Sequence, residues 1–173
     1  MKQKFPFVLA VLGMVGGVFI SILFGINEDI FKDKIAKDIR TNQKIMSIVD
    51  EGERESKIKA EEGKNWRYYQ RFHFHATGIS AMTLSTLILL AFSLAPAGLK
   101  LASSYMISVG GFLYPFIWLF AGIYGPVMGR SAAKESFAIF GYMGGVFLLG
   151  LVLASVIVIA YPLVFVRDPQ DRS

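Results

Sequence analysis

The sequence contains 173 residues, of which 54% are apolar and 18% charged, and its mean hydropathy is +0.50. The charges are grouped into separate segments, as a lipid environment requires, so we do not expect a soluble domain. Cysteine is absent, which excludes disulfides and thiolate sites, and we attribute the net charge of +5 to membrane flanks and lipid headgroups, not to nucleic-acid binding.

Four apolar segments are each long enough to cross a hydrocarbon core of ~30 Å as a helix, which takes roughly 20 residues. They cover residues 5–25, 74–94, 105–128 and 137–166. The first has a longer apolar core than a cleaved signal peptide, so we expect an uncleaved signal anchor. The sequence therefore predicts an all-α fold, a four-transmembrane-helix bundle with a helical extramembrane insert between the first two helices. The predicted parts are a first transmembrane helix (1–26), the insert (27–72), a three-helix transmembrane bundle (73–166) and a polar tail (167–173).

The hydrophilic insert has the pattern of a helical hairpin. A turn signal at residues 50–52 separates an amphipathic stretch from a charged segment, 53–64. In the charged segment Glu and Lys recur four residues apart, a spacing that stabilises a helix. We expect the amphipathic helix to lie on the membrane or to pack against the bundle, with its apolar face formed by Phe31, Ile35, Ile39 and Met46.

The segment before the second apolar run, NWRYYQRFHFH (65–75), interleaves aromatic and basic residues. Such side chains concentrate at the level of lipid headgroups, so most of this segment is typical of an interfacial anchor. It also contains His73 and His75, the only histidines of the chain.

Short connections at residues 95–103 and 129–136 predict that the last three apolar helices are antiparallel neighbours. Glycines at close helical spacing in the first, third and fourth helices indicate tight packing, and they would also suit a homodimer or a partner subunit. We expect Pro115 and Pro126 to kink the third helix and Pro162 to end or bend the fourth.

Two features of the sequence favour opposite membrane orientations. Lys2 and Lys4 precede the first helix and acidic residues follow it, which places the N-terminus in the cytoplasm and the insert in the periplasm. The Lys and Arg residues of the insert favour the reverse, although its acidic residues nearly balance them. We give the first helix more weight and expect the insert on the periplasmic side of a bacterial inner membrane.

The topology places the start of the second helix, the end of the third and the start of the fourth at one membrane face. Ionisable residues at membrane depth are candidates for function, so we expect a site at this face, beneath the insert. The candidate cofactor-binding residues are Tyr69, Arg71, His73, His75, Arg130 and Glu135, with Lys134 at the same level.

The two histidines admit several interpretations. Residues two apart on a helix point about 200° from each other, so both cannot bind one ion from one side. His75, the deeper of the two, could be an axial haem ligand, whereas a zinc or copper site would also need Glu135. Either histidine could hydrogen-bond a quinone or a lipid headgroup beside Tyr68 and Tyr69. In the remaining interpretation, backbone carbonyls or water satisfy both imidazoles at the interface.

The stretch RFHFHATGISAMTLSTLILLAF (71–92) resembles the start of a haem-ligating helix in the catalytic subunits of haem–copper oxidases, where an Arg and aromatic residues precede a His. This resemblance implies His75 as an axial ligand of haem iron. The oxidases supply further histidines from later helices, and this chain has none after His75, so bis-histidine ligation would need a dimer or a partner subunit. Residues 65–150 also resemble small uncharacterised bacterial four-helix membrane proteins with the same H-x-H opening.

We therefore expect an integral membrane accessory subunit, associated with redox chemistry through a haem or quinone at the histidines. Its expected partners are the bilayer and either another subunit or a second copy. The alternative is a structural or assembly protein of the membrane without a cofactor. No nucleophile-elbow, zinc-protease or P-loop motif is present, so we expect no enzyme activity from the chain alone.

Overall fold

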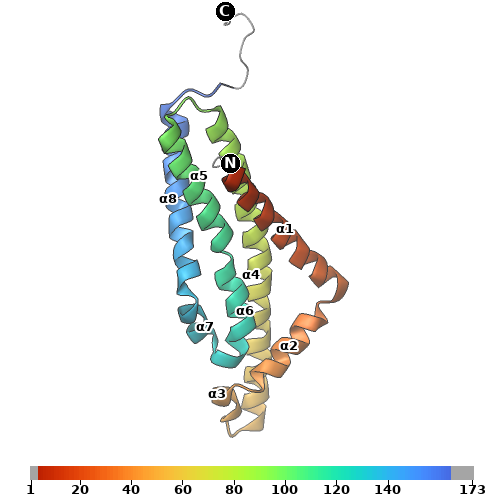
Figure 1. Ribbon diagram of the computed structural model, residues 1–173. Coiled ribbons are helices and arrows are strands. Elements are labelled where there is room, and N and C mark those ends of the chain that lie inside the picture. The colour runs from red at the N-terminus through yellow and green to blue at the C-terminus, as the bar shows by residue number, and fades with distance from the viewer. Residues whose placement is uncertain (1–3, 165–173) are drawn as a thin grey trace, which may run out of the picture.

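The computed structural model describes residues 4–164, and within this part of the chain every helix or strand that can be assigned is a helix (Figure 1). The helices are α1 (Lys4–Asn27), α2 (Asp29–Ile39), α3 (Gln43–Met46), α4 (Glu51–Phe92), α5 (Ala97–Leu113), α6 (Phe116–Met128), α7 (Arg130–Ser136) and α8 (Ala138–Ala160). The predicted all-α fold is confirmed, while the predicted polar tail lies outside the described residues. An isolated bridge between Ser93 and Leu163 joins the α4–α5 loop to the chain that follows α8.

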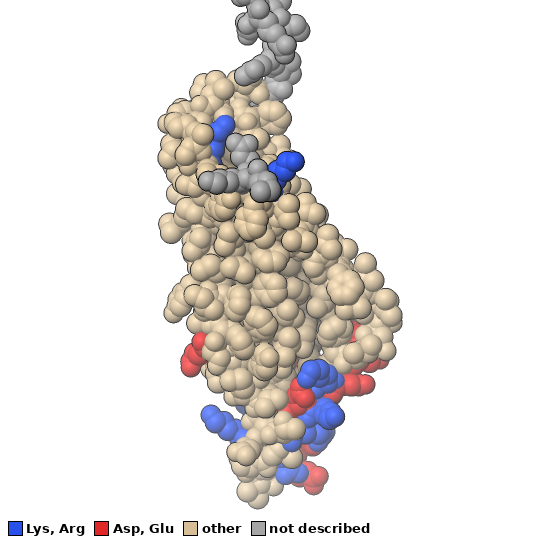
Figure 2. Space-filling view, viewed as in Figure 1, with Lys and Arg blue, Asp and Glu red and all other residues tan. Residues whose placement is uncertain are grey.

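Four helical segments are long and apolar enough to cross a membrane, namely α1, α4, the α5–α6 pair and α8. In Figure 1, α4, the α5–α6 pair and α8 run along the length of the molecule, and α1 leans away from them toward α2. On the face in Figure 2 the middle of the molecule shows no charged side chain, and most of the charges gather around the insert. Each of the four predicted apolar segments thus contains a long helix or a pair of helices, although α8 ends at Ala160, before the predicted end of the fourth.

α5 and α8 approach so closely that their backbones touch. A Cβ atom added at Gly150 would lie 2.8 Å from the backbone nitrogen of Ile107, and one added at Gly110 would lie 2.6 Å from that of Phe147. The hydroxyl of Ser103 also donates to the carbonyl oxygen of Gly150 at 3.0 Å. Tight packing at glycine was predicted at other positions, and there the structure shows it at Gly17 and Gly144 but not at Gly145.

The third apolar segment consists of two helices. α5 gives way to α6 at Pro115, which has no N–H to donate to the carbonyl oxygen four residues earlier. The expected kink at Pro115 is confirmed, whereas α6 continues through Pro126. α7 follows after Gly129, whose φ of +89° lies in a region that favours glycine.

α4 is a single helix of 42 residues. At 1.5 Å per residue it is about 63 Å long, so it extends well beyond a ~30 Å hydrocarbon core. It begins after Asp50, whose side chain accepts a hydrogen bond from the backbone N–H of Glu53 at 2.6 Å. The sequence changes from charged to apolar near residue 72 without a proline, so the helix continues. The boundary expected between residues 72 and 73 therefore lies inside one helix.

α2 and α3 pack against the first half of α4 and form a core that is separate from that of the bundle. Rings of Phe24, Phe31 and Trp66 pack at the corner between α1 and α2, with centroids 4.9–6.2 Å apart. The isoleucines of α2 are buried, as the amphipathic pattern predicts, but Met46 is 41% exposed, because α2 ends before it and α3 is a separate short helix. This insert core consists of Ile35, Ile39, Ile45, Ile58 and Tyr69.

Candidate functional site

The candidate site lies where the middle of α4 meets the end of α6 (Figure 1). α2 also contacts α6 here, and α7 follows α6 directly, so the part of α4 that precedes the second apolar segment lies beside the end of the third. The predicted start of the second apolar segment lies further along α4, where His75 packs beside Trp118 near the start of α6. The partly buried Arg130–Glu61 pair and a cavity lie here, whereas Arg71, His73 and His75 lie about 15–21 Å further along α4.

The two histidines lie on opposite sides of α4. The Nδ1 atom of His73 lies 2.8 Å from the carbonyl oxygen of Gly17, so His73 faces α1. The Nδ1 atom of His75 lies 2.8 Å from the carbonyl oxygen of Arg71, one turn earlier in α4, and its ring packs beside Trp118 of α6. The helical spacing explains the difference, because residues two apart point about 200° from each other.

Both imidazoles use Nδ1 as the donor, because a carbonyl oxygen only accepts hydrogen bonds. A neutral imidazole of this tautomer keeps a lone pair on Nε2, which can accept a hydrogen bond or bind a metal. Within residues 4–164, however, no three His, Asp or Glu side chains form a metal-binding group. Among these residues neither histidine forms a direct hydrogen bond with Arg130 or Glu135.

The other candidates on α4 make aromatic contacts. Tyr69 is buried in the insert core, where its ring lies 5.3 Å from that of Phe31. The guanidinium of Arg71 lies over the ring of Trp118, 4.9 Å from its centroid, which is a cation–π contact. The Nε1 atom of Trp118 is buried and has no hydrogen-bond partner among the described residues.

Arg130 has a partner that we did not identify from the sequence. Its Nε donates to Oε2 of Glu61 at 2.7 Å, and Lys64 donates to the other carboxylate oxygen at 3.2 Å. Burial alone would raise the pKa of the Glu61 carboxyl, but the hydrogen bonds from Arg130 and Lys64 outweigh burial and lower that pKa below its ordinary value. Lys134 and Glu135 are exposed on α7 and form no ion pair within residues 4–164.

A cavity of about 210 Å³ adjoins the Arg130–Glu61 pair. Asn42 donates to the carbonyl oxygen of Pro126 at 3.1 Å, which ties the start of α3 to α6 beside the cavity. Asn65 donates through Nδ2 to the carbonyl oxygen of Glu61 at 2.9 Å. We call this space the interfacial cavity, and its polar lining includes Asn42, Lys44, Lys57, Glu61, Asn65 and Arg130.

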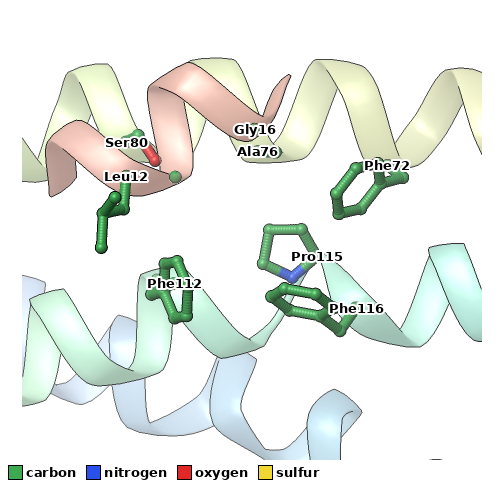
Figure 3. Close-up of a pocket in the computed structure, with 10 residues that line it drawn as sticks. Leu12, Gly16, Phe72, Ala76, Ser80, Phe112, Pro115 and Phe116 are labelled. Atoms are coloured by element: carbon green, nitrogen blue, oxygen red, sulfur yellow. The ribbon is translucent and has the colours of Figure 1, made fainter. Parts of the chain in front are cut away.

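A second cavity, of about 250 Å³, lies at the break between α5 and α6 (Figure 3). Phe72, Phe112 and Pro115 surround it, and Ser80 supplies the only polar side chain among the residues that line it. α1 and α4 form one wall and the α5–α6 pair forms the other. With no charged side chain in its lining, this cavity suits only an apolar group.

We did not identify Glu61, Asn65 or Asn42 from the sequence as members of the site. The sequence contains one signal for two of them, because Glu61 and Asn65 lie one helical turn apart at the start of the interfacial aromatic segment. The partners of Asn42 on α6 and of Glu61 on α7 are more than sixty residues away, so sequence spacing gives no indication of these two pairings. No family model, curated protein or solved structure matches the chain, so the functional argument rests on geometry.

Proposed function

We propose that this protein is an integral membrane protein that acts as a non-enzymatic accessory subunit and presents its insert to a partner at the membrane surface. The observation that supports this proposal is the continuity of α4, whose first half carries the insert core and whose second half belongs to the apolar bundle. The insert is therefore a preformed surface with its own buried core. A partner that binds such a surface loses little free energy to the ordering of a loop.

Single cysteines can test the proposed membrane placement, because the chain has none of its own. With the insert in the periplasm, as we propose, a membrane-impermeant maleimide should label Glu55→Cys in intact cells and leave Ile88→Cys unlabelled. Labelling of Glu55→Cys only after lysis would place the insert in the cytoplasm. Equal labelling of the two positions would contradict the proposed spans.

Photo-crosslinking in membranes tests the proposed partner. A benzophenone amino acid at Val49, which is 96% exposed at the turn before α4, should give a protein adduct of one fixed mass. The matched control is Ile159, which is 85% exposed on α8, where we expect lipid as the neighbour and no protein adduct. The proposal fails if Val49 gives no protein adduct and the mildly solubilised protein is a monomer.

A redox role is the second candidate. The observation that favours it is that each histidine bonds a carbonyl oxygen through Nδ1, together with the Nε1 of Trp118 beside His75, which has no hydrogen-bond partner among the described residues. An axial haem ligand needs a lone pair on a ring nitrogen, and a quinone carbonyl could accept from the indole. A Soret band in protein from haem-replete cells, lost in His75→Ala and kept in His73→Ala, would support haem binding at His75. A colourless preparation would favour the first proposal, an accessory subunit that binds no haem.

A further inference from the structure

We propose that the interfacial cavity binds a phosphate ester that carries a hydroxyl group, such as the headgroup of an anionic glycerol lipid. The inference is independent of the partner surface of the insert. Its lipid form rests on the proposed membrane placement, whereas a soluble phosphate ester would bind the same residues without a membrane.

The charge of the cavity favours an anion. Three cationic side chains, Lys44, Lys57 and Arg130, line it together with the single carboxylate of Glu61. Arg130 pairs with Glu61, but Lys44 and Lys57 form no ion pair within residues 4–164. Two unneutralised ammonium groups around one small cavity stabilise a phosphate, and each can donate a charge-assisted hydrogen bond to it.

A buried amide oxygen in the lining requires a donor. Asn65 is 1% exposed, and its Nδ2 is already bonded to the Glu61 carbonyl oxygen. Its Oδ1 is buried and has no hydrogen-bond partner among the described residues. Phosphate oxygens cannot satisfy this acceptor at neutral pH, but a hydroxyl on the same ligand can. The ligand therefore needs an anionic group and a neutral donor.

The position of Oδ1 indicates how the hydroxyl reaches it. A Cβ atom at Gly125 would lie 2.5 Å from Oδ1 of Asn65 and 3.7 Å from Cγ of Arg130, so both side chains adjoin this glycine. Because Oδ1 is covered, the hydroxyl reaches it only when a neighbouring side chain moves. The Arg130 side chain is 35% exposed and has room to turn toward a bound phosphate.

The size and depth of the cavity suit a headgroup. Its volume of about 210 Å³ is below the ~300–1,000 Å³ of pockets that hold drug-sized molecules. Asn65 precedes the second apolar segment and Pro126 lies near the end of the third, so the cavity is at the level expected for lipid headgroups. Lys44 and Lys57 are exposed, which leaves the cationic side of the cavity open to a ligand.

Lipid titrations of the purified full-length protein in neutral detergent test the proposal. We expect phosphatidylglycerol to bind about tenfold more tightly than zwitterionic phosphatidylcholine. We also expect it to bind about fivefold more tightly than phosphatidylmethanol, which has the phosphate but no hydroxyl. The variant Lys44→Gln/Lys57→Gln should weaken phosphatidylglycerol binding about tenfold. The matched control, Lys37→Gln/Lys134→Gln, removes the same charge from exposed lysines outside the cavity and should bind as the wild type does.

The outcomes separate the possible sources of the ligand. Competition by glycerol 3-phosphate would identify a soluble ester as a ligand, and failure to compete would assign the site to the lipid headgroup. Equal weakening in the two double variants, or equal affinity for phosphatidylglycerol and phosphatidylcholine, would overturn the site. Equal affinity for phosphatidylglycerol and phosphatidylmethanol would overturn the hydroxyl contact with Asn65. None of these outcomes depends on a partner protein, so the inference can fail while the proposed function stands.

Discussion

The two halves of α4 pack against their neighbours in different ways. Before Phe72, the helix buries Ile58 and Tyr69 against isoleucines of α2 and α3. Ion pairs surround this core, including Arg40 with Glu55 at 2.9 Å. This half is packed like a small water-soluble domain, in which the removal of apolar surface from water supplies the driving force.

After Phe72, the helix comes close to α1 and α5. A Cβ atom at Gly17 would lie 2.8 Å from the backbone nitrogen of Thr77, and one at Gly111 would lie 3.0 Å from Oγ1 of Thr83. Close backbone approach is how helices gain contact energy in lipid, where no hydrophobic effect drives them together. The two halves of α4 thus pack by different means, and substitutions should have different consequences in them.

The largest expected effect is in the insert core. Ile39→Ala removes a fully buried side chain and should cost about 2–5 kcal/mol, the range for such truncations. We expect amide hydrogens of α2 to exchange at least about tenfold faster, while those of α8 are unchanged. Ile30→Ala, on the same helix but 65% exposed, is the control and should leave exchange as in the wild type. Equal effects of the two substitutions would contradict a separate insert core.

Overpacking tests the other half of the comparison. In Gly150→Val the new side chain would meet the backbone of Ile107, so α5 and α8 must separate, at a cost of about 1–3 kcal/mol. Gly145→Val makes the same change on the same helix where no atom lies within 4 Å of the new Cβ. Thermal unfolding in detergent should show a lower Tm for Gly150→Val alone. A similar decrease in Tm for Gly145→Val would contradict this explanation, because the loss of a glycine would then lower the Tm without any close contact between helices.

The Arg130–Glu61 pair joins the first half of α4 to α7 and should make stability depend on pH. The pKa of Glu61 lies below its ordinary value of 4.5, so the pair stabilises the fold above that pH, and the stabilisation is lost as pH falls through the folded-state pKa. At pH 7, Glu61→Gln should lower the free energy of unfolding by about 1 kcal/mol. Below pH 4.5 its unfolding should vary less with pH than that of the wild type.

Glu135→Gln is the control for this experiment, because Glu135 is exposed and forms no ion pair within residues 4–164. It should keep the wild-type pH profile. A Glu61→Gln profile that matches the wild type would show that the pair does not hold α4 to α7.

The smallest expected effect is at the Arg40–Glu55 pair. Glu55 accepts two hydrogen bonds from Arg40, at 2.9 and 3.1 Å, but both side chains are exposed to water. Surface pairs of this kind contribute little and are screened by salt. Glu55→Gln should therefore reduce stability less than Glu61→Gln does, and the difference from the wild type should vanish in 1 M salt. A larger loss than that of Glu61→Gln would contradict this ranking.

Hydropathy predicted most of the fold. The four apolar helices follow from segment length, because a bilayer requires about 20 apolar residues per helix. The burial of Ile35 and Ile39 follows from their spacing on an amphipathic helix. The continuity of α4 was missed, because the change from charged to apolar residues suggested a boundary where the backbone has none.

The site was harder to predict than the fold. Topology placed Arg71, His75 and Arg130 at one level, but Arg130 pairs with Glu61, about 15–21 Å along α4 from the first two. Arg130 bonds to a carboxylate sixty-nine residues earlier, and the choice between Glu61 and Glu135 depends on how α4 is rotated against α6. That rotation is set by packing between distant segments, such as the ring of Tyr69 against Gly122, which no local pattern contains.

The hydrogen bond from His73 to α1 has a mechanical consequence. An unbroken helix transmits torque, because twisting it at Phe72 would break backbone hydrogen bonds on both sides. A load that turns the insert about the axis of α4 therefore turns His73 as well, and His73 pulls on the carbonyl oxygen of Gly17. Since Gly17 also contacts the backbone of Thr77, α1 has little freedom to slip. Rotation of the insert about the axis of α4 is therefore coupled to displacement of α1.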